Sequence, residues 1–281
     1  MLRIALLAAS VAVIAWFHDT PRFTHNVRGQ TLLPDQRMVR VLSKPVASMV
    51  TDFYWIRMVN LAATAKLPWE GKQVIKWGEF VTDLEPTFFY AYMVGGLLGT
   101  IDVGDETWNV DEAVALLDKG MRTLPDEPRL AIYQSFLLLN MKHDPAAAAR
   151  VLERASKSPR APAYLAQLAT RLYANAGDFD AATEFARQVS ENSDDETRAF
   201  FTTRLLEIEQ EKLLVEVDDA AALFREAHGR AAVDLDELVG AKLLPGVPED
   251  PLGGTISLTP EGARASSRPS RLRPHQPLLP P

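Results

Sequence analysis

The sequence predicts an all-α protein made of serial helical hairpins, with an apolar helix before them and a small α+β cap after them. Three observations support this prediction. Apolar residues recur at helical spacing over most of the chain, and small residues recur in register every 33 to 39 residues. Sustained alternation of apolar and polar residues is confined to residues 253–266, where it predicts a short strand pair.

Composition sets the class of protein before any motif is considered. The chain has 281 residues, of which 47% are hydrophobic and 24% charged, as expected for a folded protein with a substantial core. Its net charge of -7 provides no basic field for a polyanion, so we expect no nucleic-acid partner. The absence of cysteine excludes disulfides, thiolate metal sites and cysteine nucleophiles.

The N-terminus carries an apolar run from Ile4 to Phe17 that follows Arg3. At about 1.5 Å per residue this run rises roughly 21 Å, which is short of the ~30 Å hydrocarbon core and closer to the apolar region of a signal peptide. "VIA", ending at Ala15, is a candidate cleavage site, whereas the aromatic pair that follows favours an uncleaved anchor. We expect residues 1–18 to be a signal anchor, with a cleaved signal peptide as the alternative. Either one exports the body of the chain.

Helical patterning begins after residues 19–44, which lack a sustained period and are expected to form a linker. Pro45 precedes an amphipathic segment, and a helix over 46–65 pairs with a second helix over 71–84. The apolar positions of the first helix are Val46, Met49, Val50, Phe53, Ile56 and Val59.

The stretch "RLYANAGDFDAATEFARQ" reads as helix, turn and helix. Gly177 and Asp178 supply the turn, and Asp178 or Asp180 can cap the second helix. A small residue, a bulky residue four positions later and usually a small residue three positions after that mark this helix and three related ones. The four sets are Ala113, Leu117, Gly120; Ala148, Leu152, Ala155; Ala181, Phe185, Gln188; and Ala220, Phe224, Ala227.

This pattern resembles the tetratricopeptide repeat (TPR), which has a period of about 34 residues. The resemblance covers residues 46–227 and implies a right-handed superhelix of antiparallel helix pairs. It departs from the family pattern at Gln188, in the scarcity of first-helix tryptophan and glycine, and in the long loop "GTIDVGDETWN". An irregular alanine-rich helical bundle is the alternative.

The resemblance also implies a concave groove, lined by the first helix of each pair, that suits an extended peptide. Tyrosines and mixed polar groups provide contact area with hydrogen-bonding tips. The groove residues implied by the register are Tyr92, Tyr133, Asn140, Thr170, Tyr173, Glu209 and Lys212. The alternative is that they are ordinary half-buried helix residues.

Residues 228–266 are expected to form the small cap. Asp234 can cap a short helix "LDELV" that ends at Gly240, and a hairpin turns at "PEG". The segment resembles the C-terminal region of major pseudopilins, although the chain lacks the N-terminal glutamate that pilin assembly needs. The matching residues are Leu235, Leu238, Val239, Leu244, Pro245, Asp250, Pro251, Gly253 and Gly254. Residues 267–281, rich in proline and arginine, are expected to be disordered.

No catalytic, cofactor or metal site is predicted. The five histidines are scattered, and His228 near Asp234 and Asp236 is explained equally well by a helix end. "GGLLG" at 95–99 is expected to serve close helix packing, and the acidic "ENSDDE" at 191–196 is expected to form a solvated turn between repeats.

These observations favour a non-enzymatic, membrane-anchored TPR-like scaffold that binds a peptide or protein partner in a bacterial envelope assembly. The expected location is the inner membrane, with the body in the periplasm, or the exterior after signal cleavage. The alternative is a structural component of a secretion, pilus or motility apparatus, and an envelope enzyme with an unfamiliar site is the third class. The partner and the oligomeric state are left open.

Overall fold

A computed structural model describes residues 33–103, 106–268 and 271–272. The predicted signal anchor at residues 1–18 lies outside them. Within the described part, no helix combines the length and apolar character needed to cross a membrane.

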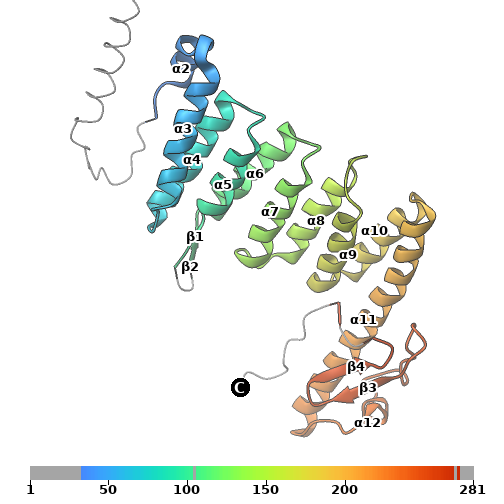
Figure 1. Ribbon diagram of the computed structural model, residues 1–281. Helices are drawn as coiled ribbons and strands as arrows, with labels where there is room; N and C mark the ends of the chain where they lie inside the picture. Colours follow the sequence, from blue (N-terminus) through green and yellow to red (C-terminus); the bar gives the residue numbers. More distant parts are fainter. Residues whose placement is uncertain (1–32, 104–105, 269–270, 273–281) are drawn as a thin grey trace, which may run out of the picture. The chain divides into compact units, whose positions relative to one another are not determined.

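The described part is all-α with two small strand pairs, which confirms the predicted fold class at that level. Figure 1 shows the helices beside one another in chain order. The helices are α2 (Gln36–Leu42), α3 (Ala47–Ala62), α4 (Pro68–Leu84), α5 (Phe89–Leu98), α6 (Val110–Thr123), α7 (Pro128–Asn140), α8 (Pro145–Ser156), α9 (Tyr164–Ala176), α10 (Phe179–Glu191), α11 (Asp195–His228) and α12 (Leu235–Gly240). A 3-10 turn, η1 (Lys44–Val46), lies between α2 and α3.

From α3 to α11 each helix packs against the next helix in the chain. Next-but-one pairs also pack: α3 on α5, α4 on α6, and α5 on α7. Helices therefore meet both within a hairpin and between successive hairpins, and their apolar faces form a nearly continuous series of core clusters.

The second helices α6, α8 and α10 begin at equivalent positions. Asn109, Asp144 and Asp178 precede them, separated by 35 and 34 residues. The side chains of Asp144 and Asp178 each accept a hydrogen bond from a free backbone N–H at the helix start, which confirms the predicted cap at Asp178. Four positions after each of these residues lies a fully buried alanine: Ala113, Ala148 and Ala182.

The predicted register of α10 is wrong by one residue. Ala181 was assigned the small position that Ala113 and Ala148 occupy, but Ala181 is only half-buried and Ala182 takes that position. One residue rotates a helical position by about 100°, which is enough to move a side chain off the buried face.

The helix pair predicted around the last marker set, which begins at Ala220, is also wrong, because Asp195–His228 is one continuous helix, α11. The span contains no glycine or proline to end a helix within it. Ala220 and Phe224 are buried against the cap, whereas Ala227 is exposed. The last marker set therefore matches the repeat pattern by coincidence, because its residues lie on a single long helix and not on a helix pair.

The predicted linker and the long loop both contain regular structure. Asp35 accepts a hydrogen bond from the Met38 N–H and caps α2, so part of 19–44 is helical. The loop between α5 and α6 holds an antiparallel pair, β1 (Ile101–Val103) and β2 (Glu106–Trp108).

The apolar stripe predicted on the first amphipathic helix does not face the core. Val46, Met49, Phe53 and Ile56 are exposed, and the buried side of α3 carries Met58 instead. Both sides of α3 are apolar, so periodicity alone could not tell which one the neighbouring helix covers.

The C-terminal cap forms as predicted. Asp234 accepts a hydrogen bond from the Glu237 N–H at 3.0 Å and caps α12, which ends at Gly240. Strands β3 (Ile256–Thr259) and β4 (Gly262–Ala265) pair antiparallel around the "PEG" turn. The cap shares one core cluster with the second half of α11.

Two local interpretations are confirmed, and a third is confirmed in part. His228 lies at the end of α11, where its Nδ1 is 3.0 Å from the Phe224 carbonyl oxygen. Gly95 and Gly96 pack closely against leucine side chains of α6. Of the acidic stretch 191–196, only residues 192–194 form the turn, because Glu191 ends α10 and Asp195 begins α11. Asp194 caps α11 by accepting from the Thr197 N–H, which lowers the pKa of its carboxyl.

Candidate functional site

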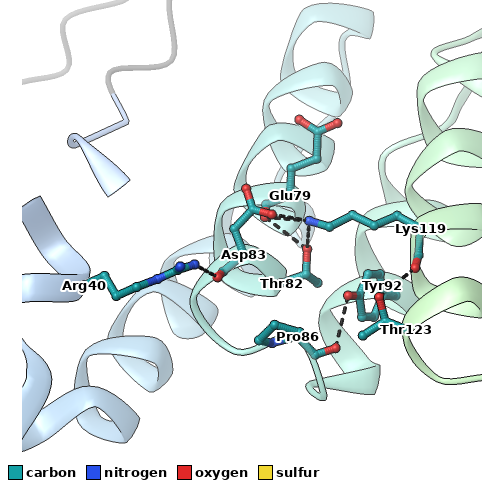
Figure 2. Close-up of polar contacts among 8 residues, drawn as sticks. All are labelled: Arg40, Glu79, Thr82, Asp83, Pro86, Tyr92, Lys119 and Thr123. Carbon is teal, nitrogen blue, oxygen red and sulfur yellow. Dashed lines mark hydrogen bonds and ion pairs between the residues drawn. The ribbon is translucent and has the colours of Figure 1, made fainter. Parts of the chain in front are cut away.

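Three of the seven predicted groove residues are core residues, and their assignment is wrong. Tyr92 and Thr170 are fully buried, and 4% of the Tyr173 surface is exposed. The Tyr92 ring packs over Gly120, and its hydroxyl donates to the Pro86 carbonyl oxygen at 3.1 Å (Figure 2). These side chains cannot reach a partner without disrupting the core.

Hydrogen bonds hold Thr170 and Tyr173 in place. The Thr170 hydroxyl donates to the Gln167 carbonyl oxygen, and the Tyr173 hydroxyl donates to a Glu153 carboxylate oxygen at 2.6 Å. Burial and this hydrogen bond raise the pKa of Tyr173. The face of α9 that carries Thr170 and Tyr173 is therefore packed in the core, and the groove register that implied their exposure is wrong for this helix.

Tyr133 and Asn140 do lie on an exposed face, that of α7. Arg129, Tyr133, Phe136 and Asn140 follow one another at steps of four, three and four residues, which places them on one side of the helix. Tyr133 is half-buried, and 50% of Phe136 is exposed. Asn140 donates from its side chain to the Phe136 carbonyl oxygen at 2.9 Å. Their contact with a partner stays a prediction.

The first turn of α7 meets α5 in a cluster of rings around one cation. The Arg129 guanidinium lies 4.0 Å from the centroid of the Phe89 ring. Phe89 in turn lies 5.2 Å from Tyr90 and 6.5 Å from Tyr133, centroid to centroid. We call Phe89, Tyr90, Arg129 and Tyr133 the Arg129 cluster.

Glu127 fixes the orientation of Arg129. Its carboxylate accepts from Nε at 2.6 Å and from Nη2 at 2.5 Å, a two-point contact that holds the guanidinium plane. The hydrogen bond from Arg129 lowers the pKa of Glu127, so the carboxylate stays ionised. The cation is thus held over the Phe89 ring, and 52% of its side chain remains exposed.

Helix α9 presents a comparable exposed face. Tyr164, Leu168 and Arg171 are exposed and follow one another at steps of four and three residues, as on α7. Sequence reasoning missed these residues, and it missed Arg129 and Phe136 as well. Phe136 stands within a run of apolar residues, so its spacing alone did not distinguish it from the core of α7.

The remaining predicted residues, Glu209 and Lys212, line a different cleft. It is open, has a volume of about 630 Å³, and lies between α10 and α11. Phe179 and Leu205 provide its apolar part, and no residue of α7 lines it. The structure therefore divides the predicted groove residues among the core, the face of α7 and this cleft.

A second group of polar side chains lies on α4 and α6 (Figure 2). Lys119 on α6 contacts the Asp83 carboxylate at 2.5 Å and the Thr82 hydroxyl at 2.8 Å. Arg40 donates to the Asp83 carbonyl oxygen and connects α2 to the same point. Desolvation raises the pKa of the neighbouring Glu79 carboxyl, although Glu79 is exposed as a residue. These contacts join three helices, and we interpret them as structural.

The predicted disordered tail begins with an ordered contact. Leu272 is buried, and its backbone N–H donates to Glu211 on α11 at 2.8 Å. Arg271 pairs with the same carboxylate, and Arg268 pairs with Glu207. The prediction of disorder from residue 267 is therefore wrong for these residues, because Arg268 and Arg271 each meet an acidic residue of α11 that lies far away in sequence.

Among the described residues, no group of three or more histidine, aspartate or glutamate side chains is arranged to hold a metal ion. No protein-family model, curated protein or solved structure matches this chain. The interpretation of its function therefore depends on the site itself.

Proposed function

We propose that this protein is a non-enzymatic, TPR-like scaffold whose first helices bind a peptide or protein partner. The proposal includes a right-handed superhelix of helix pairs, an N-terminal membrane anchor at residues 1–18, and a body in the bacterial periplasm or outside the cell. Two observations support the TPR-like arrangement of helices. Helix α4 packs on α6 and α5 packs on α7, and the starts of the second helices are spaced by 35 and 34 residues.

The Arg129 cluster is the observation that carries the binding proposal. Tyrosine and arginine are the residue types most enriched where binding energy concentrates, because they bury large flat surfaces and still form hydrogen bonds. Glu127 and Phe89 hold Arg129 in place, so little side-chain entropy would be lost on binding. Phe136 and Tyr164 extend exposed aromatic surface to the next positions on α7 and α9.

The test is site-specific photocrosslinking with the full-length chain in its own cells. A photoreactive residue replaces Phe136 or Tyr164 in separate variants, and the control carries it at Leu223, an exposed position on α11. We expect Phe136 and Tyr164 to capture the same discrete partner and Leu223 not to capture it. Adding Arg129→Ala should reduce the capture severalfold. Equal capture from all three positions, or none at Phe136 and Tyr164, would overturn the proposal.

The alternative is a structural component of a secretion, pilus or motility apparatus. The folded α12, β3 and β4 unit favours it, because the pseudopilin-like residues do form a compact cap on α11. Asp250, one of these residues, is buried and accepts from the Gln210 side chain at 2.6 Å. Capture of one apparatus in fixed stoichiometry through the cap, for example from a photoreactive residue at Val247, would favour this alternative.

A further inference from the structure

Helix α3 has two opposite apolar sides, and only one of them is packed. Met58 is fully buried on the packed side, where Trp55 also contacts the neighbouring cluster. On the other side an uninterrupted stripe is open to solvent. Its residues and exposed fractions are Val46 47%, Met49 72%, Phe53 53% and Ile56 57%.

Helix α2 adds to this open surface at the same end of the chain. None of its residues is buried, and Met38, Val41 and Leu42 are each more than 60% exposed. We call these three residues and the four of the α3 stripe the N-terminal apolar surface. Exposed apolar residues in this number are rare on soluble proteins unless something covers them.

The net charge of the residues that carry the N-terminal apolar surface indicates what covers it. Residues 33–66 contain five cationic and two anionic side chains, whereas the whole chain has a net charge of -7. All five cations are exposed: Arg37, Arg40, Lys44, Arg57 and Lys66. Arg40 also donates to the Asp83 carbonyl oxygen on α4, and Arg57 lies over the Phe53 ring. Helices that lie on anionic lipid typically carry apolar side chains with cations around them. The apolar side chains enter the acyl boundary of the bilayer, and the cations meet the lipid headgroups.

We propose that the N-terminal apolar surface lies on an anionic lipid bilayer, with α2 and α3 in the plane of the interface. Asp52 and Arg57 flank the α3 stripe on either side, which suits a helix that lies flat and not one that crosses the bilayer. This inference goes beyond partner binding, because it concerns α2 and α3 and not the exposed face of α5, α7 and α9.

Two other occupants account less well for the cations. A second copy placed symmetrically on this surface would bring Arg37 and Lys44 close to the same cations of its partner, which is repulsive. The apolar segment 4–17 has no carboxylate to pair with them. An anionic bilayer covers the apolar residues and neutralises the charge together.

The experiment uses the full-length chain reconstituted into vesicles. The natural chain has no cysteine, so Met49→Cys carries a single fluorophore, and Leu223→Cys provides an exposed control on α11. Nitroxide-labelled lipid quenches a fluorophore in the bilayer, and iodide quenches one in water. In phosphatidylglycerol vesicles we expect position 49 to be quenched severalfold more by the lipid than position 223, with the reverse order for iodide.

Charge reversal separates this contact from simple anchoring by the N-terminus. Arg37→Glu with Lys44→Glu, or replacement of the lipid by phosphatidylcholine, should weaken the surface contact on the order of tenfold or more. Position 49 should then become accessible to iodide while the chain still sediments with the vesicles. If the quenching at position 49 is unchanged by charge reversal, the proposed surface contact is wrong.

Each other outcome overturns the proposal and identifies a different occupant. Protection from both quenchers that disappears as the chain is diluted in lipid indicates a second copy. Protection from both at every dilution indicates the chain's own N-terminal segment. Quenching of position 49 by iodide alone indicates that the surface stays in water.

Discussion

Arg271 donates to the carboxylate of Glu211 at 2.9 Å, which joins the C-terminal segment to the middle of α11 across 60 residues of sequence. Glu211 is buried, with 1% of its side chain exposed. It also accepts from the Leu272 N–H, while Arg271 reaches Asp218 with its second nitrogen. Arg271 and Leu272 are thus fixed to α11 by two of its carboxylates.

Removal of this cation should be costly. Arg271→Ala leaves Glu211 without its ionic partner, and the loss of one member of a buried pair typically costs about 3 kcal/mol or more of unfolding free energy. Arg160→Ala is the matched control, because its pair with Asp126 is exposed and should contribute no more than about 1 kcal/mol. Chemical denaturation of both variants measures the difference. Equal losses would contradict the assignment of the segment to α11.

The register of α10 can be tested with adjacent alanines. Ala182 is fully buried, so Ala182→Leu should overpack the contact and cost about 1–3 kcal/mol. Ala181→Leu changes a half-buried position next to it and should cost clearly less. Thermal unfolding of the two variants decides between the registers, and a larger loss at Ala181 would favour the one predicted from the sequence.

The close approach of α5 to α6 depends on Gly120. A Cβ atom at this position would lie 2.8 Å from the Tyr92 ring, so Gly120→Ala requires the ring to move. We expect a net loss of about 1–2 kcal/mol, because overpacking outweighs the gain in helix propensity. Gly240→Ala is the control, since nothing lies within 4 Å of its added methyl group. That variant should be neutral or slightly more stable in the same denaturation assay.

Glu237 should titrate far below its ordinary value of 4.5. A two-point hydrogen bond from Arg230 and one from the Val233 N–H lower its pKa to about 2. Because the folded-state pKa is lowered, the stabilisation is present above about pH 4.5 and is lost as the pH falls toward 2. Carboxyl NMR should show the low midpoint in the native chain.

Arg230→Gln provides the control for this titration. It removes the largest cause of the shift, so the midpoint of Glu237 should rise toward 4.5. The Val233 N–H should keep part of the shift. An unchanged midpoint would mean that Arg230 does not bind Glu237 in solution.

Local signals in the sequence predicted the elements that depend on local physics. The caps at Asp178 and Asp234 bind backbone N–H groups three residues away, so the residues that form them are adjacent in sequence. The same holds for the left-handed Gly177 at the end of α9 and for the turn between β3 and β4. Helical class and cap therefore followed from patterns a few residues long.

The candidate site was predicted only in part. Tyr133 and Asn140 lie on the exposed face of α7, whereas Tyr92 is buried although Ala113 of the following helix is correctly in register. Thr170 and Tyr173 are buried in α9, and the marker predicted for the following helix, Ala181, is one residue away from the buried position. A helix turns about 100° per residue, so register had to be known to the single residue.

The sequence by itself determined the helix caps at Asp178 and Asp234, the turn at Gly177 and the strand pair of the cap, since these depend on contacts between near neighbours in the chain. Only the tertiary structure decided which apolar side of α3 is packed, that α11 continues without a break, and that Arg271 belongs to Glu211. Burial and ion pairing depend on which surface from a distant part of the sequence packs against a residue. That surface is set by the packing of all the helices together.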